Sequence, residues 1–261
     1  RDIGVTGVQT CALPICMHYT SDLLRKMCDV WSATGGSGLI AFHGQSGDIM
    51  FQGIKTENVQ KAFDEFNEMG FDLGGAGPAL RTSMSCVGAA RCEMSCYDEA
   101  KALRTVINNN LDDMHRPSLP YKFKFKFSGC PNDCVNAIQR SDMATIGTWR
   151  DNIRVNEEQV QAYYKAHGMN DLVNDVISKC PTKAITLVAS DKFKSSENVS
   201  AASLGDGNTL CIDNKNCVRC MHCLNVIPGG LLPGSDKGVT ILVGDKRSEE
   251  HTSELQSRQY L

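Results

Sequence analysis

Cysteine is the residue type that most restricts how this chain can fold. The sequence holds 13 cysteines in 261 residues, and most of them form two sets of four: Cys86, Cys92, Cys130 and Cys134, then Cys180, Cys217, Cys220 and Cys223. A chain of this length can bury a hydrophobic core, so it does not need disulfides to stay folded. We therefore expect both sets to be metal ligands rather than disulfide partners.

Charge and hydropathy exclude several classes of protein. The formal net charge of −3 at pH 7 gives no electrostatic reason to expect nucleic acid or an acidic membrane surface as a partner. No apolar run approaches the ~20 residues that cross a bilayer, and the first residues lack the basic start and apolar middle of a secretory signal. We expect a globular, cytoplasmic protein without membrane insertion.

The two ends differ in character from the rest of the chain. Residues 1–15 (RDIGVTGVQTCALPI) and 247–261 (RSEEHTSELQSRQYL) resemble translated sequencing-adapter DNA. We interpret 1–16 and 247–261 as foreign segments that do not belong to the fold; natural disordered termini are the alternative. The remainder divides into a domain at 17–168 and a smaller inserted domain at 169–246, where the sequence becomes polar and rich in cysteine.

Hydrophobic periodicity predicts a mixed α+β fold. Apolar residues recur at helical spacing in several stretches, and alternation or short apolar runs mark strands in others. The expected helices cover 19–31, 56–69, 97–108, 157–166 and 172–178, with another beginning after Pro131, and the expected strands cover 39–42, 49–51, 121–127, 143–149, 184–188 and 239–243.

The first cysteine set has spacing compatible with an iron–sulfur cluster. Five residues separate Cys86 from Cys92, and three separate Cys130 from Cys134. Four thiolates can hold a [4Fe–4S] cube because each iron takes one soft ligand. Cys96 offers a competing register with Cys92, and four buried free cysteines are the alternative to a cluster.

A strand with one basic face precedes the second pair of this set. In residues 121–127 (YKFKFKF), period-2 alternation places Lys122, Lys124 and Lys126 on one face and three phenylalanines on the other. Such a row of ammonium groups can attract an anion. Lysines that protect a sheet edge from aggregation are the alternative interpretation.

The second set is typical of a ferredoxin. Cys217, Cys220 and Cys223 follow the close spacing of bacterial ferredoxin ligands, and Cys180-Pro181 matches the remaining ligand. Zinc is the competing metal, since four thiolates also satisfy a tetrahedral ion and His222 offers a further donor.

Several separated motifs resemble one known family. The stretch 128–134 (SGCPNDC) resembles the siroheme and cluster motif of the sulfite and nitrite reductases. Leu80-Arg81-Thr82 before Cys86, and residues 119–124 (LPYKFK) before Cys130, resemble the α subunits of dissimilatory sulfite reductases within that family. The resemblance covers the chain between its two foreign ends, with the order and spacing of the motifs kept.

This resemblance implies a siroheme and two [4Fe–4S] clusters, in a sulfite reductase domain with an inserted ferredoxin-like domain. Cys134 would ligate the first cluster and bridge to the siroheme iron. The other seven cysteines of the two sets would be cluster ligands. Arg81, Lys122, Lys124 and Lys126 would line the siroheme and sulfite pocket as cofactor-binding and catalytic residues. Further basic residues of the family's pocket precede this stretch.

The implied activity is the six-electron reduction of sulfite to the sulfide level in anaerobic sulfur metabolism. The implied partners are a β subunit in an α2β2 complex, a small sulfur-carrier protein and an external electron donor. The reductive or oxidative direction, and a catalytic or structural role for the siroheme, stay open. A two-cluster electron-transfer protein without siroheme, and a zinc-stabilised binding module, are the alternatives.

The remaining notable residues are expected to be structural. Cys28 and Trp31 fall on the apolar face of the first helix, and Cys211 is expected to be a buried or free thiol. Cys96 is expected to pack beside the first cluster. His43 and Asp48 are expected to stabilise a turn.

Overall fold

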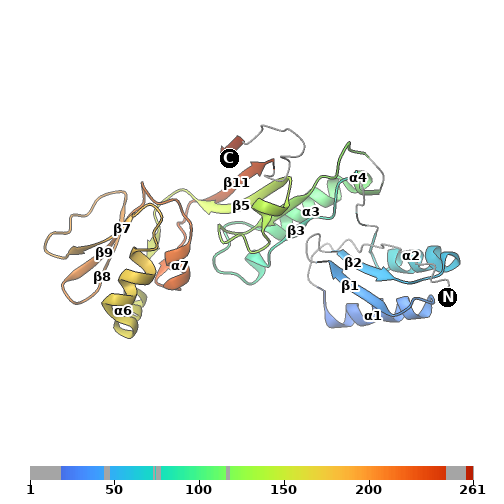
Figure 1. The fold of residues 1–261 in the computed structure, drawn as a ribbon, viewed down its shortest axis with the longest axis horizontal. Coiled ribbons are helices and arrows are strands. Elements are labelled where there is room, and N and C mark those ends of the chain that lie inside the picture. The colour runs from blue at the N-terminus through green and yellow to red at the C-terminus, as the bar shows by residue number, and fades with distance from the viewer. Residues whose placement is uncertain are drawn as a thin grey trace.

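The computed structural model describes residues 19–43, 48–72, 74, 78–115, 118–244 and 257–260. Figure 1 shows three successive parts along an elongated molecule, with the N-terminal part at one end, a central sheet, and a cysteine-rich part at the other end. The mixed helices and strands confirm the predicted fold class.

The N-terminal part is a β-hairpin with two amphipathic helices. It comprises α1 (Ser21–Ala33), β1 (Leu39–His43), β2 (Asp48–Gln52), η1 (Thr56–Asn58) and α2 (Val59–Glu68). Thr20 caps α1 by accepting a hydrogen bond from the Leu23 amide at 3.2 Å. Helices and hairpin share a core that includes Met27, Trp31, Phe51 and Phe66.

Trp31 is fully buried in that core, as the sequence predicts. The prediction for Cys28 is wrong, because its side chain is exposed. Its neighbour Met27 takes the buried position instead. The turn expected between His43 and Asp48 includes residues 44–47, which lie outside the described residues.

The central sheet positions the first cysteine set. Its strand order is β12 (Ser257–Tyr260), β11 (Lys237–Val243), β5 (Met143–Trp149), β4 (Phe125–Ser128) and β3 (Met84–Ser85). The three strands β3, β4 and β5 are parallel, and β11 is antiparallel to β5. η2 (Gly88–Ala90) follows β3.

Helices cover both faces of this sheet. Phe127 contacts residues of α3 (Glu99–Asn109) and α4 (Leu111–His115) on one face. Ala144 and Ile146 pack with α5 (Ala137–Arg140) on the other. Because residues paired across strands share a face, Lys126, which pairs with Ala144, points toward the α5 side.

The predicted strand at 121–127 is shorter in the structure, where β4 begins at Phe125. Phe123 contributes only an isolated bridge to Leu80. The reason is local, since the Lys124 amide donates to the Asp142 carboxylate at 2.8 Å instead of to a neighbouring strand. The three phenylalanines still pack together on the α3 face, as predicted.

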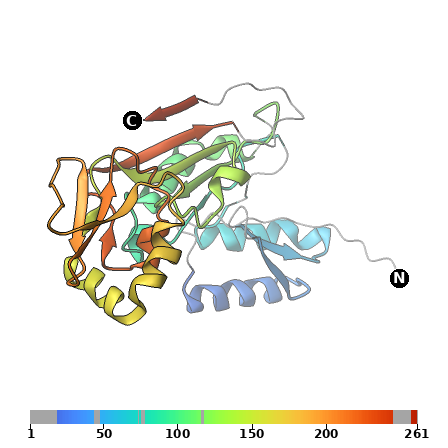
Figure 2. The same cartoon turned by 60° about the vertical axis from the view of Figure 1, so that its left-hand side comes forward.

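The cysteine-rich part lies between β5 and β11. It contains β6 (Arg154–Val155), α6 (Glu157–Asp171), the π-helical segment η3 (Leu172–Ile177), β7 (Ile185–Ala189), β8 (Val199–Ser203), β9 (Asn208–Asp213), α7 (His222–Val226) and β10 (Leu231–Leu232). Strands β7, β9 and β8 form an antiparallel sheet, and β10 pairs with β6. Figure 2 brings this part forward, with α6 below the small sheet.

The predicted domain boundary at 168/169 stays a prediction. That boundary falls within α6, at Gly168, where a φ of +79° kinks the helix. Val160 before the kink and Leu172 after it belong to the same core. Trp149 pairs directly with Lys237 across β5 and β11, so we propose 150–236 as the insertion.

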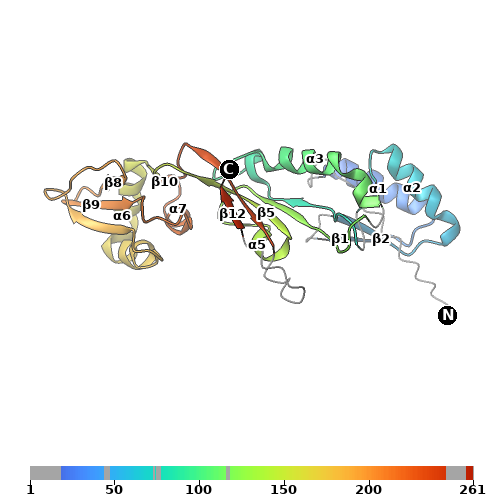
Figure 3. The same cartoon turned by 90° about the horizontal axis from the view of Figure 1, so that it is seen from above.

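Some predictions concern the ends of the chain. Residues 1–16 lie outside the described residues, as do 245–256. β12 pairs with β11 in the antiparallel sense, with Tyr260 opposite Thr240, close to the C-terminal label in Figure 3. The foreign origin of both ends stays a prediction. Within the described part of the chain, no helix is both long and apolar enough to cross a membrane.

Candidate cluster-binding sites

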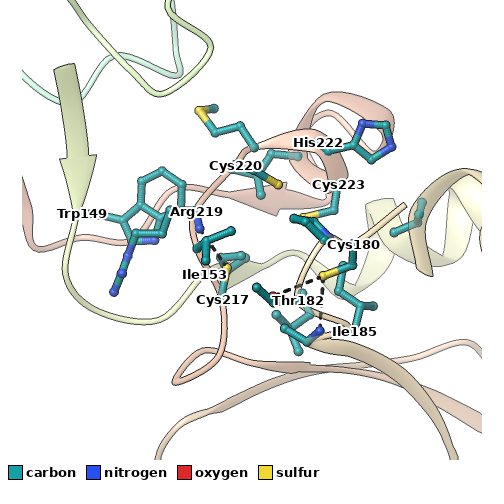
Figure 4. A pocket seen from close by; sticks show the side chains of 17 residues that line it. Trp149, Ile153, Cys180, Thr182, Ile185, Cys217, Arg219, Cys220, His222 and Cys223 are labelled. Carbon is teal, nitrogen blue, oxygen red and sulfur yellow. Dashed lines mark hydrogen bonds between the residues drawn. The ribbon is translucent and has the colours of Figure 1, made fainter. Parts of the chain in front are cut away.

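The second cysteine set surrounds a single pocket. Cys180, Cys217, Cys220 and Cys223 line it together with apolar side chains that include Ile153, Ile185 and Ile212. The pocket holds about 410 Å³ of empty space, part of it open to solvent. Figure 4 shows the four cysteine side chains around it, which come from the segment after η3, the loop after β9 and α7.

Two left-handed residues shape the loop that carries three of these cysteines. Arg219 has a φ of +56° and Met221 a φ of +66°, a backbone region that residues other than glycine adopt rarely. The Met221 side chain is buried, and the Arg219 amide donates to the Cys217 sulfur at 3.4 Å. The strained backbone therefore winds the loop around the pocket.

The thiols of this pocket differ in acidity for local reasons. Burial raises the pKa of Cys223 to about 12, and the neighbouring Cys217 and Cys220 add to that effect. Burial also acts to raise the pKa of Cys180, but the Ala184 amide, at 3.2 Å from its sulfur, and other donors outweigh it and lower the pKa. Four cysteines around one space, of which Cys223 is buried, suit a metal that replaces their protons.

His222 also lines this pocket, and one of its ring nitrogens is already bound. Its Nε2 lies 2.7 Å from the Asp175 backbone oxygen, so that nitrogen carries the proton and donates. Among the described residues, no three His, Cys, Asp or Glu side chains are grouped closely enough to hold one metal ion. In a [4Fe–4S] cube each cysteine binds a different iron, so the four cysteine sulfurs lie farther apart than they do around a single metal ion.

The first set gathers around Gly129. The Gly129 amide donates to the Cys86 sulfur at 3.2 Å, and the Gly129 carbonyl accepts from the Cys96 amide at 2.7 Å. Burial raises the pKa of Cys130 to about 11, and nearby Cys92 and Cys134 raise it further. The structure thus brings all four predicted residues to one place.

Cys96 lies beside this set without a separate role in it. Its side chain is buried, and its thiol donates to the Met94 carbonyl at 3.6 Å. A Cβ on Gly147 of β5 would come within 3.1 Å of the Cys96 Cβ, so this thiol packs tightly against the sheet. Cys211 is buried on β9, as the sequence predicts.

Asp133 shapes the Cys130–Cys134 loop. Its backbone is left-handed, with a φ of +46°. Its carboxylate accepts hydrogen bonds from the Ser128 hydroxyl and from the Ala137 and Ile138 amides. The loop is therefore held at both ends by one side chain, which sequence reasoning missed.

Arg81 and Thr82 carry buried polar atoms without a partner. Arg81 Nε and Thr82 Oγ1 are both buried and form no hydrogen bond within the described structure. Buried polar groups are normally paired. A buried cationic nitrogen without a partner suits an anionic group, which is the environment that the sequence predicts for Arg81.

The three lysines of the predicted row differ in their surroundings. Lys122 is exposed and Lys124 half-buried. Lys126 is 3% exposed, and its Nζ donates to the Val135 carbonyl at 2.9 Å. The place of Lys126 in the anion-binding row stays a prediction, and its ammonium group also holds the loop after Cys134.

The two cysteine sets adjoin each other. Asn132, in the first loop, and Asn225, on α7, exchange two hydrogen bonds at 2.7 and 3.1 Å. Cys130 and Cys223 also belong to one hydrophobic core. No pattern in the sequence predicts that Asn132 and Asn225, which are 93 residues apart, form hydrogen bonds with each other.

Comparisons with known proteins agree with this geometry. Residues 76–259 match the family described as nitrite and sulphite reductase 4Fe-4S domain. The chain is 56% identical over 231 residues to the dissimilatory-type sulfite reductase subunit alpha of Allochromatium vinosum, covering 88% of this chain and 51% of that protein. It is 41% identical over 249 residues to the subunit of the same name from Nitratidesulfovibrio vulgaris, covering 90% and 53%.

A solved structure has the same fold. The crystal structure of dissimilatory sulfite reductase I matches with a TM-score of 0.80 at 40% identity, covering 95% of this chain and 56% of that one. The chain spans about half the length of the relatives it matches. It belongs to the nitrite and sulphite reductase family, whose 4Fe-4S domain it carries.

Proposed function

We propose that this chain is part of the α subunit of a dissimilatory sulfite reductase, which reduces sulfite to the sulfide level. The observation that carries the proposal is the pair of unpartnered buried atoms, Arg81 Nε and Thr82 Oγ1, a few residues before Cys86. An anion pocket beside a cluster has a use in reducing an oxyanion, and little use in a simple electron carrier.

The cofactors of the proposal are a siroheme and two [4Fe–4S] clusters. Cys86, Cys92, Cys130 and Cys134 would hold the first cluster, with Cys134 also reaching the siroheme iron. The pocket of Cys180, Cys217, Cys220 and Cys223 would hold the second. When bound, the siroheme supplies an iron that takes up sulfite and passes electrons to it.

The chain's own residues would bind the anions and move protons. Arg81, Lys122 and Lys124 supply positive charge toward the carboxylate arms of siroheme and toward sulfite. Reduction by six electrons also consumes six protons while oxygens leave as water, so cationic donors that stabilise departing oxygen assist it. We assign Lys126 to the support of the Cys134 loop, because its ammonium group is bound to Val135.

Electrons would enter at the second cluster and pass to the first. The contact between Asn132 and Asn225 supports this proposal, because neighbouring sites allow electrons to pass between them. The proposal includes a β subunit in an α2β2 complex, a small sulfur-carrier protein and an external donor as partners, in the cytoplasm.

Spectroscopy of the complete, anaerobically purified complex tests the proposal. We expect siroheme absorption bands in the red region, and sulfide-level products from sulfite with a low-potential donor. Broad cluster absorption without siroheme bands would instead indicate a two-cluster electron carrier. Zinc in place of iron and sulfide would indicate a zinc-stabilised binding module.

A further inference from the structure

Positive charge is concentrated around the pocket of the second cysteine set. The two segments that carry its cysteines, residues 179–183 (KCPTK) and 214–223 (NKNCVRCMHC), contain no aspartate or glutamate. They hold four cationic residues, which we call the basic rim: Lys179, Lys183, Lys215 and Arg219. Because the whole chain has a formal net charge of −3, this positive charge is a local feature of the pocket.

The charges of the basic rim are not neutralised within the chain. Lys179, Lys183 and Lys215 are exposed. Within the part of the chain that the structure describes, no ion pair and no side-chain hydrogen bond involves these three lysines. Arg219 donates to the Arg150 carbonyl at 2.6 Å, which is an uncharged partner. The four cations are therefore available to an external anionic group.

The acidic residues nearest along the chain do not balance the basic rim. The Asp213 carboxylate accepts hydrogen bonds from the Lys215 amide at 3.0 Å and from the Asn216 side chain at 2.7 Å. Asp175 is exposed on η3, four residues before Lys179. Two carboxylates stand against four cations, so the surface around the pocket keeps a net positive charge.

The pocket opens to the surface within the basic rim. Cys220 is exposed, whereas Cys223 is buried. Thr182 and Val218 also line the pocket and are exposed, with 59% of the Val218 surface accessible. Figure 4 shows Cys220 and Thr182 at this pocket. A cluster held by these cysteines would therefore have one ligand, Cys220, at the protein surface.

This combination of features suits a transient protein interface. Exposed Val218 supplies an apolar contact beside Cys220, and the basic rim supplies charge around it. Electron-transfer partners bury little area, and long-range charge brings them together quickly in the right orientation. The sign of the charge selects the partner, since a positive surface attracts an acidic protein and repels a basic one.

We infer that the basic rim docks an acidic electron-carrier protein, which reduces the second cluster through the face that bears Cys220. The inference deepens the proposed function, and it rests on that function in that the second set holds an iron–sulfur cluster. In the step, the carrier is oxidised by one electron and the cluster is reduced by one electron. No covalent bond forms or breaks.

The test measures binding of a small acidic bacterial ferredoxin, as the probe, to the complete anaerobic complex at several salt concentrations. We expect its affinity to fall as salt rises, because salt screens exposed charges. The double variant Lys179→Glu, Lys215→Glu should slow association and weaken binding about tenfold. Lys165→Glu is the matched control, since Lys165 is exposed on α6, which contributes no residue to the pocket.

A second donor separates docking from damage to the cluster. Reduced methyl viologen is a small cation that needs no docking surface, so it should reduce the second cluster of the double variant at least as fast as that of the unaltered complex. If the double variant loses this cluster, the neutral pair Lys179→Gln, Lys215→Gln replaces it. That pair must weaken ferredoxin binding while methyl viologen still reduces the cluster.

Ferredoxin binding that does not change with salt, or an equal loss in Lys165→Glu, would overturn the inference. So would unchanged ferredoxin binding in a lysine double variant that keeps its cluster. These results would leave the proposed function standing, because siroheme bands and sulfite reduction with methyl viologen are measured separately. Absence of siroheme from an unaltered complex with both clusters would overturn the proposed function and leave the docking surface in place.

Discussion

Asn132 and Asn225 face each other as a reciprocal amide pair, each side chain donating one hydrogen bond to the other. Asn132 lies between Cys130 and Cys134, and Asn225 lies two residues after Cys223. The pair thus joins the two loops that we propose as cluster sites. The loss of stability when this pair is removed therefore reports how firmly the two sites are held together.

Asn225→Ala is expected to loosen this junction. The pair is exposed, so its loss should cost about 1 kcal/mol, and a double-mutant cycle with Asn132→Ala should return a coupling energy of similar size. Hydrogen exchange of α7 and the Cys130–Cys134 loop is the measurement. Asn174→Ala, at an exposed position on η3, is the control. Additive effects of the two variants would show that the pair does not couple the loops.

Cys134→Ser in the intact complex should abolish sulfite reduction while the cluster of the second set remains. Cys134 is the exposed cysteine of its set, as expected of a ligand that also reaches a second cofactor, and serine is a harder, poorer ligand for iron. Sulfide-level products and cluster signals are measured together. Cys28→Ser removes another exposed thiol and should leave both unchanged. Continued turnover in Cys134→Ser would contradict the bridging role.

Asp133→Ala should reduce iron at the first set without affecting the second. Its carboxylate holds three donors around the Cys130–Cys134 loop, so the variant frees both ends of that loop. Loss of such caps typically costs about 1 to 2 kcal/mol. Iron analysis and cluster spectra are the measurements, with Asp142→Ala, which removes an acceptor at the start of β4, as a comparison. Equal losses in both variants would indicate general unfolding.

Lys126→Met tests whether this lysine supports the loop or belongs to the anion-binding row. The variant leaves the carbonyl of the half-buried Val135 without this partner, which should cost about 1 kcal/mol, and should speed hydrogen exchange at Val135 and Asn136. Lys122→Met should weaken sulfite binding and leave exchange in that loop unchanged. If both variants weaken sulfite binding equally and amide hydrogen exchange at Val135 and Asn136 does not change, Lys126 belongs to the anion-binding row that the sequence predicts.

The stability of the metal-free, reduced chain should fall as pH rises above about 9. Burial raises the pKa of Cys96 and Cys130 to about 11 and that of Cys223 to about 12, from an ordinary value of 9.0. The folded chain then holds protons that the unfolded chain releases, so alkali favours unfolding across that window. Denaturant titrations under anaerobic conditions measure it. Cys223→Ala should flatten the dependence, Cys28→Ala should not, and a metal-loaded chain should lack it.

Much of the fold was predictable because local patterns set it. The periodicity of Val59–Glu68 and the run Met143–Trp149 identify a helix and a strand correctly. Spacing also identified the cysteines that line the second pocket. In each of these places a short stretch of sequence is enough to predict the local structure.

Long-range contacts were not predictable in this way. The alternation of residues 121–127 predicts one continuous basic face, but Asp142 ends the strand pairing at Lys124, and the loop after Cys134 covers Lys126. Glu99 reads in the sequence as an ordinary first-turn acid, and only the fold shows that Gly88 makes room for it. Such relations depend on which segments the topology brings together.

The pairing of Trp149 with Lys237 has a consequence for how this architecture can change. The chain leaves the central sheet and returns to it on adjacent strands, so a short turn could replace residues 150–236 without rethreading the rest. A sheet of this kind can gain or lose such a part through a single insertion event. The surface where the two cysteine sets meet, at Asn132 and Asn225, would then have to be refitted to a new neighbour.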